Sequence, residues 1–139
     1  MFDSCLYVSR SNLKISSCAR EVGEIVKRAQ DKNELLEITG SLIFTGTNFA
    51  QFIEGSTASI DRLMSNLRND TRHSDVQVVA RNQAQDRYFR DWRMAYSGPS
   101  TYVNRHISPL MEEIVHGTDL TIRGRRLFTL MKELNAQLG

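Results

Sequence analysis

The stretch Asn48–Glu54, with the sequence NFAQFIE, decides the fold because it places an amide side chain inside an apolar strand. Side chains alternate between the two faces of a strand, so Gln51 shares its face with Phe49 and Ile53, and this face should be buried. A buried primary amide without partners costs about 1–3 kcal/mol, so a polar group must lie against Gln51. An amide carries its donor and its acceptor at opposite ends, and rotating it reverses the polarity that its neighbours meet. The stretch therefore predicts a buried strand with a central amide, Gln51, that could act as a switch by rotating and exchanging its donor and acceptor.

Two other predicted strands could place a polar group against Gln51. Residues 2–9 form the first and carry Tyr7, whose hydroxyl can bond to an amide. Residues 92–96 form the second, and their alternation places the indole of Trp92 and the thioether of Met94 on one face. Both strands are therefore candidates to lie near the Gln51 strand.

Two amphipathic helices are predicted between these strands. The apolar stripe of the first consists of Val22, Ile25, Val26 and Ala29, and that of the second of Ile60, Leu63, Met64 and Leu67. The first helix should end near residues 31–33, and Ser56 is a good N-cap for the second. A helix with a single apolar stripe needs one surface to lie on, so both helices should cover one face of a sheet.

The remaining strands complete the order of elements. Residues 38–44 are joined to the Gln51 strand by a short segment containing Gly46, which is typical of a hairpin. Val76, Val78 and Ala80 alternate with Gln77 and Val79 as a fourth strand. The order βαββαββ predicts an α+β sandwich of the ferredoxin-like type, with a five-stranded mixed sheet and two helices on one face.

Residues 99–139 are predicted to form helices only. One helix should begin at Ser108, before Pro109, and end at Gly117. The other has an unbroken apolar stripe of Leu127, Leu130, Met131, Leu134 and Leu138. We expect residues 1–98 to form one domain and residues 99–139 a helical extension. The extension should dock on the free face of the sheet or on another chain.

Composition excludes several classes of protein. A chain of 139 residues, 40% of them hydrophobic, is long enough for one domain with a real core. A formal net charge of +2 is too small for a dedicated nucleic-acid binder. Apolar runs are too short to span a membrane, and Cys5 and Cys18 form neither a disulfide framework nor a metal motif. We expect a cytoplasmic protein without a metal site.

Five motifs, in this order along the predicted elements, carry a resemblance to a known family. They are Tyr7, NELLEITG at 33–40, QFIEG at 51–55, RHS at 72–74 and WRM at 92–94. The chain resembles the BLUF domain, a blue-light sensor that uses a flavin, over about residues 2–97. It is most similar to the short stand-alone members of that family.

The resemblance implies a noncovalent flavin between the two helices, usually FAD, with FMN or riboflavin as alternatives. Tyr7 would be the electron donor, Gln51 the amide between tyrosine and flavin, and Asn33 a fixed partner of the flavin carbonyl and ring NH. Further contacts implied by the resemblance are Ile25, Lys32, Arg72 and His73, although Lys32 replaces the smaller polar residue or histidine that we expect there. In the family, blue light drives electron and proton transfer from tyrosine to flavin and leaves a small red shift.

The same resemblance implies how the signal would leave the site. Trp92 and Met94 occupy the strand positions that relay the change outward. The chain would then be a photosensor without catalytic activity of its own. It would act on an unknown downstream protein, or as a homo-oligomer, and not on nucleic acid or a membrane.

Elementary chemistry supports these roles independently. A phenol has a reference pKa of about 10 and is neutral at pH 7, but it becomes a strong acid when it loses an electron. Its proton then needs an acceptor about 2.6–3.2 Å away, which Gln51 can provide. An amide NH directed at a flavin ring, or withdrawn from it, would change the electronics of that ring.

Other readings of the same residues stay open at this stage. A small acylphosphatase-like hydrolase shares the predicted topology, but residues 10–14 lack the glycines that would let a loop hold an anion. An RNA-binding module would expose Tyr7, Trp92 and Tyr96 on the sheet. Taken alone, Tyr7 and Gln51 could be structural, and Asn33 could be a helix C-cap in the left-handed conformation. Both alternative functions predict a colourless protein.

Overall fold

The computed structural model describes residues 1–12, 18–97, 100–111 and 117–138. Five strands form one sheet: β1 (Phe2–Ser11), β2 (Thr39–Phe44), β3 (Asn48–Gly55), β4 (His73–Ala84) and β5 (Trp92–Ser97). The helices are α1 (Cys18–Leu35), α2 (Thr57–Arg68), α3 (Thr101–Ile107), the 3-10 turn η2 (Ser108–Met111) and α4 (Gly117–Leu138). The strands lie in the order β4-β1-β3-β2-β5, and only β5 runs parallel to its neighbour, β2.

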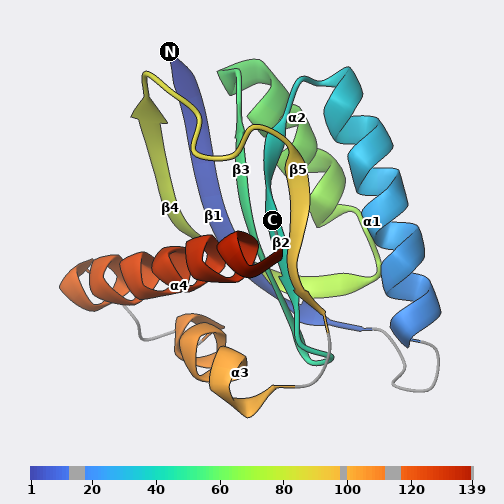
Figure 1. Cartoon of the computed structure of the whole chain (residues 1–139), viewed down its shortest axis with the longest axis vertical. Coiled ribbons are helices and arrows are strands. Elements are labelled where there is room, and N and C mark those ends of the chain that lie inside the picture. Colours follow the sequence, from blue (N-terminus) through green and yellow to red (C-terminus); the bar gives the residue numbers. More distant parts are fainter. Residues whose placement is uncertain (13–17, 98–99, 112–116, 139) are drawn as a thin grey trace.

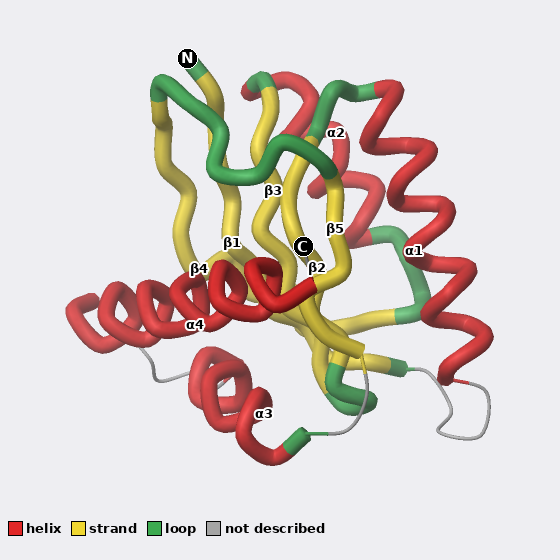
Figure 2. The backbone as a smooth tube through the Cα atoms, in the orientation of Figure 1, coloured by secondary structure: helices red, strands yellow, loops and turns green. Residues whose placement is uncertain are grey.

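The helices cover the sheet from both sides. Figure 1 shows α1 and α2 on one face, whereas α4 crosses the strands on the opposite face with α3 beside it. The tube in Figure 2 shows the same layers by secondary structure. The predicted α+β ferredoxin-like sandwich, with a mixed sheet and two helices on one face, is confirmed, and the later helices form the additional layer.

The face under α1 and α2 carries two apolar clusters. The cluster under α2 consists of Cys5, Tyr7, Ile38, Ile53, Ile60 and Met64. The cluster under α1 consists of Leu42, Phe44, Phe49 and Trp92, with Ile25, Val26 and Ala29 of the helix packed on it. These helix residues belong to the stripes that the sequence predicts, so the stripes determine which face each helix buries. Ser56 caps α2 through a hydrogen bond of 3.1 Å from Ser59 N to its Oγ.

The opposite face forms the largest cluster of the molecule. Leu127, Leu130 and Met131 of α4 are buried there against residues such as Leu6, Ile43 and Phe52 of the sheet. Val103 and Ile107 of α3 belong to the same cluster. Burying apolar surface contributes about 25 cal/mol per Å², so the stripe of α4 is a substantial part of the stability of this layer.

The C-terminal helices begin and end at other residues than predicted. Ser100 caps α3 by accepting a hydrogen bond of 3.1 Å from Val103 N, so the helix starts about two turns before the Ser-Pro pair that resembles an N-cap. Residues Ser108–Met111 continue it as a 3-10 turn, because proline fits the first turn of a new helical segment. Gly117 is the first residue of α4 and not a helix stop. Residues 112–116 lie outside the description.

Two elements of the sheet layer also differ from prediction. Helix α1 continues to Leu35, so Asn33 lies inside its last turn, and Glu37 with φ 55° takes the left-handed conformation after it. Strand β4 is longer than 76–80 and contains register shifts against β1. Because one shift falls between Leu6 and Tyr7, Val79 and Ala80 both pack in the α4 cluster, whereas unbroken alternation would place Ala80 on the face of Val78, which is 39% exposed.

No described helix has the length and apolar character needed to cross a membrane.

Gly40, at the start of β2, allows β2 and β3 to approach closely. A Cβ added there would lie 1.9 Å from the carbonyl oxygen of Phe52. Gly40→Ala should therefore lower the free energy of unfolding by about 3 kcal/mol or more, because the backbone of β3 must move away. Denaturant unfolding measures this loss directly.

Gly23→Ala is the matched control. Nothing lies within 4 Å of a Cβ at Gly23, which is exposed on α1. Alanine is the better helix former by about 0.5–1 kcal/mol, so this variant should be as stable as the wild type or more stable. Equal stability of Gly40→Ala and the wild type would contradict the register of β2 against β3.

Candidate functional site

Tyr7 and Gln51 form a buried polar pair at the centre of the sheet. They lie directly opposite each other in the β1–β3 ladder. Tyr7 is 2% exposed and Gln51 6%, and Tyr7 Oη donates a hydrogen bond to Gln51 Oε1. Burial raises the pKa of the Tyr7 hydroxyl far above its usual value, so the phenol stays neutral. The structure thus supplies the polar partner that burial of Gln51 requires, and this partner is the tyrosine.

Gln51 lies at the boundary between the two apolar clusters. Phe49, two residues before it, belongs to the cluster under α1, and Ile53, two residues after it, belongs to the cluster under α2. Because side chains two residues apart share a face, the amide lies on the surface between the parts of the sheet that the two helices cover. The buried polar pair therefore faces the region between α1 and α2.

Asn33 is the second buried amide on this side of the molecule. Its backbone carbonyl accepts a hydrogen bond of 2.8 Å from Ile38 N, which ties the end of α1 to the start of β2. Its side chain is fully buried, and among the described residues neither Nδ2 nor Oδ1 has a hydrogen-bond partner. Such groups cost about 1–3 kcal/mol each when left unpaired. A bound molecule that presents an acceptor beside a donor would satisfy both.

Trp92 and Met94 lie on β5, which β2 separates from the Gln51 strand. Trp92 is buried in the cluster under α1, and its Nε1 has no hydrogen-bond partner among the described residues. Leu42 is paired with Gln51 on one side and with Met94 on the other, so one strand separates Met94 from the amide. The side chain of Met94 lies outside the description.

His73 joins the site from the start of β4. Ser9 Oγ and His73 Nδ1 are 2.9 Å apart, and the His73 ring meets Phe49 edge-on at a centroid distance of 5.5 Å. Burial lowers the pKa of His73, although Asp70 opposes this shift, so the imidazole is neutral at pH 7. His73 therefore contacts the Ser9–Phe49 pair of the β1–β3 ladder, two residues from the Tyr7–Gln51 pair.

The other residues named from the sequence are placed differently. Arg72 holds Asp70 in an ion pair of 2.6 Å, and this hydrogen bond lowers the pKa of the Asp70 carboxyl. Lys32 is exposed on α1, next to the buried Asn33. Ile25 is half-buried on α1 against the Trp92 cluster. The structure thus brings together Tyr7 and Gln51, places His73 against Ser9 and Phe49, places Ile25 with Trp92, and leaves Lys32 at the solvent side.

Glu54 was not singled out from the sequence. Its carboxylate is 1% exposed and accepts hydrogen bonds of 2.8–3.0 Å from the backbone amides of Tyr88 and Phe89. Burial raises the pKa of Glu54, and these amides oppose the shift. The carboxylate fixes the loop that leads into Trp92. The sequence contained one signal for Glu54: a charged side chain at the end of an apolar strand, on the same face as Phe52.

The geometry argues against the RNA-binding platform and against Asn33 as a helix cap. Tyr7 and Trp92 are buried under helices, and Tyr96 packs in the α4 cluster, so the three rings do not form an exposed platform for bases. A register shift in β5 separates Trp92 and Tyr96 onto opposite faces. Asn33 is not a left-handed C-cap, because Glu37 takes that conformation.

Comparison with known proteins defines the class of the chain. The BLUF family model, described as sensors of blue light using FAD, matches residues 2–95. The chain therefore belongs to the BLUF family of flavin-based blue-light sensors.

Two characterised relatives show the range of proteins that carry this domain. The photoactivated adenylate cyclase subunit beta of Euglena gracilis is 27% identical over 89 residues, which are 64% of this chain and 10% of that protein. The blue light- and temperature-regulated antirepressor BluF of Escherichia coli K12 is 26% identical over 82 residues, which are 59% of this chain and 20% of that protein. The chain spans a fifth or less of the length of these relatives.

Solved structures with the same fold include both small and large proteins. BlsA in its photo-activated state is 22% identical with a TM-score of 0.72, covering 96% of this chain and 94% of that one. BlrP1 of Klebsiella pneumoniae, solved with FMN and cyclic diGMP, is 31% identical with a TM-score of 0.61 and covers 68% of this chain and 25% of that one. The match to BlsA extends over the C-terminal helices.

Proposed function

We propose that this chain is a blue-light photoreceptor in which Tyr7 and Gln51 perform the photochemical step beside a noncovalent flavin. The observation that carries the proposal is the buried hydrogen bond from Tyr7 Oη to Gln51 Oε1, between the areas covered by α1 and α2. A flavin bound there supplies, once excited by blue light, an acceptor for one electron. The remaining steps belong to residues of the chain.

Asn33, Gln51 and Tyr7 are the residues that we assign to binding of the flavin. The unpaired Nδ2 and Oδ1 of Asn33 match a ring edge that presents a carbonyl and an NH side by side. Ile25 would contact the ring from α1. Lys32, Arg72 and His73 would lie toward the phosphates. Arg72 also pairs with Asp70, and His73 lies against Ser9. We assign FAD, as in the family description, rather than FMN or riboflavin.

Tyr7 can lose its proton only along its hydrogen bond to Gln51. Before illumination, burial holds the pKa of the phenol far above neutrality. Loss of an electron makes the phenol strongly acidic, and the oxygen of Gln51 is in position to receive the proton. When the electron and the proton return to Tyr7, the Gln51 amide can settle in another orientation, with donor and acceptor exchanged. That exchange is the stored signal.

We further propose how the signal leaves residues 1–98. Trp92 and Met94 would relay the change through β5, which is paired with β2 opposite Gln51. Residues 99–139 would form the output extension, acting on a downstream protein or on a second copy of the chain. Cyclase or antirepressor activity belongs to the relatives, and we assign no catalytic step to the residues described here.

Tyr7→Phe should retain the bound flavin and lose the reversible red shift, because packing is nearly conserved while the electron and proton source is removed. Gln51→Leu should also bind flavin and lose the lit form, since leucine neither donates nor accepts a hydrogen bond. Light-minus-dark absorption spectra of the purified variants measure both effects. Tyr102→Phe is the matched control, because Tyr102 is 61% exposed on α3, and its red shift should equal that of the wild type. A normal red shift in Tyr7→Phe would overturn the assignment.

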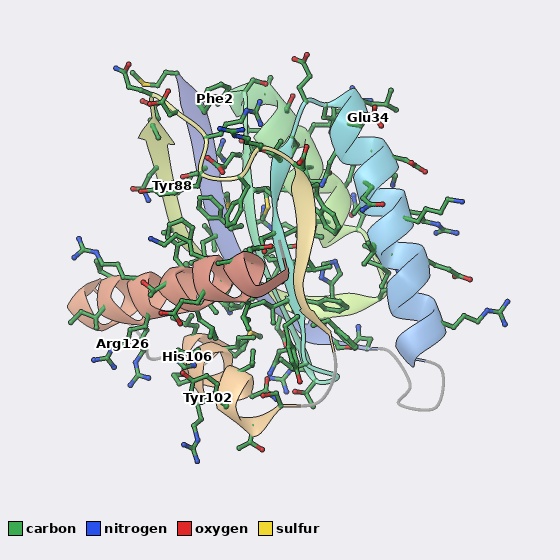
Figure 3. All side chains as sticks on the ribbon, viewed as in Figure 1. Phe2, Glu34, Tyr88, Tyr102, His106 and Arg126 are labelled. Atoms are coloured by element: carbon green, nitrogen blue, oxygen red, sulfur yellow. The ribbon has the colours of Figure 1, made fainter. Side chains whose placement is uncertain are left out.

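Asn33→Ala should lower flavin occupancy, because the ring edge would lose a fixed partner that contributes about 0.5–1.5 kcal/mol per hydrogen bond. A loss of that size weakens binding roughly two- to twelvefold. The ratio of flavin to protein after purification, followed by titration of the apoprotein with FAD, measures the change. The neighbouring Glu34→Ala, at an exposed position of the same helix, is the control (Figure 3). Equal affinity of Asn33→Ala and the wild type would leave Asn33 without a role in the site.

A further inference from the structure

A buried polar contact connects α4 to the centre of the sheet. Asn135, 8% exposed, donates a hydrogen bond of 2.7 Å from Nδ2 to Ser41 Oγ, and Ser41 is fully buried on β2. The same Nδ2 donates to the carbonyl of Met131 at 3.0 Å. Because a carbonyl can only accept, this second bond identifies the NH2 end of the amide and places Oδ1 on the other side.

The surroundings of this contact are otherwise apolar. Leu127, Leu130 and Met131 of α4 pack in the large cluster, and Phe128 stacks on Phe52 at a centroid distance of 4.5 Å. Apolar contacts depend weakly on direction, so they would persist through small movements of the strands, whether or not the helix moved as well. A hydrogen bond at 2.7 Å depends strongly on both distance and angle. The Asn135–Ser41 bond is therefore a direction-sensitive link between helix and sheet.

Ser41 occupies the strand position behind the photochemical site. On β3 it is paired with Phe52, the neighbour of Gln51, and on β5 it is paired with Arg93, between Trp92 and Met94. Leu42, the next residue, is itself paired with Gln51 and Met94. A displacement of β3 or β5 caused by a new orientation of Gln51 would thus reach Ser41 through a single ladder step.

Asn135 also carries an unused acceptor. Among the described residues, its Oδ1 is buried without a hydrogen-bond partner. A buried unpaired acceptor makes the contact easier to rearrange, because the present arrangement does not satisfy the whole amide. The Ser41 hydroxyl can donate as well as accept, so rotation of the Asn135 amide would allow the reverse bond, from Ser41 to Oδ1.

We infer that Asn135 and Ser41 are positioning residues that couple α4 to the light-driven change at Gln51. The inference rests on the proposed function and adds the contact through which a movement of the sheet would reach α4. In the dark, the bond holds the last turns of α4 against β2. In the light, movement of β2 relative to its neighbours breaks or reverses this bond, and the C-terminal half of α4 loosens.

The test compares light-minus-dark amide hydrogen exchange of residues 117–138 in the full chain with bound flavin. In the wild type, light should raise exchange in this segment roughly fivefold, the factor for one hydrogen bond of about 1 kcal/mol at 1.4 kcal/mol per tenfold. In the double variant Ser41→Ala/Asn135→Leu, the flavin red shift should persist while the exchange difference disappears. Replacing both partners by apolar groups is nearly neutral for stability, so this variant should fold.

Asn104→Ala is the matched control. Asn104 of α3 also makes a polar contact with the sheet, but its Oδ1 accepts from Thr45 Oγ1 at 2.7 Å, at the tip of the β2–β3 hairpin. This variant should keep the full exchange response of residues 117–138. If Asn104→Ala lost the exchange response to the same degree as the double variant, the loss in the double variant would be a general effect of loosening the helical layer. That result would overturn the inference.

The remaining outcomes separate this inference from the proposed function. A wild type without a red shift contradicts both. A wild type with a red shift but unchanged exchange in 117–138 contradicts the coupling alone. A double variant that keeps both the red shift and the exchange response shows that the contact is only structural and overturns its positioning role. Dark-state thermal unfolding of each variant reports any structural contribution separately.

Discussion

The hydrogen bond between Tyr7 and Gln51 is the constraint on which the rest of the structure depends. Two polar side chains can be buried on a sheet face at low cost only when each satisfies the other. Their bond requires β1 and β3 to be neighbours in the register that places residues 7 and 51 opposite each other. That register sets which residues on both strands face α1 and α2 and which face α4, because side chains alternate with period two.

The two faces of the sheet serve different purposes as a result. The face under α1 and α2 combines apolar clusters with the buried amide of Asn33, which has no hydrogen-bond partner among the described residues. The face under α4 is mainly an apolar core, and it contains the buried amide–hydroxyl contact between Asn135 and Ser41. Five strands in one hydrogen-bonded sheet lie between them. A change of hydrogen bonding on the first face could therefore displace strands whose other face packs on α4, through the ladders of β2, β3 and β5.

Much of this arrangement could be predicted from the sequence, because strand alternation and helix stripes are local patterns. They gave the burial of Gln51, the two-layer sandwich and the apolar stripe of α4. The start of α3 was predicted wrongly, since Ser108–Pro109 resembles an N-cap and Ser100 acts as one. The change of face at Ala80 was missed, because the bulge that causes it cannot be recognised from the residue types of the strand. Glu54 and Asn135 could not be assigned, because their partners lie 34 to 94 residues away in the chain.

Infrared difference spectroscopy tests the central claim most directly. The account predicts that the light-minus-dark spectrum of the flavin-loaded wild type contains bands sensitive to isotope labels in tyrosine and in glutamine. The spectrum reports rearranged bonding of the Tyr7 hydroxyl and the Gln51 amide, and the bands from both labels should vanish together in Gln51→Leu. A wild-type spectrum with flavin bands that respond to neither label would contradict the account, because the hydrogen bond between Tyr7 and Gln51 would then take no part in sensing light.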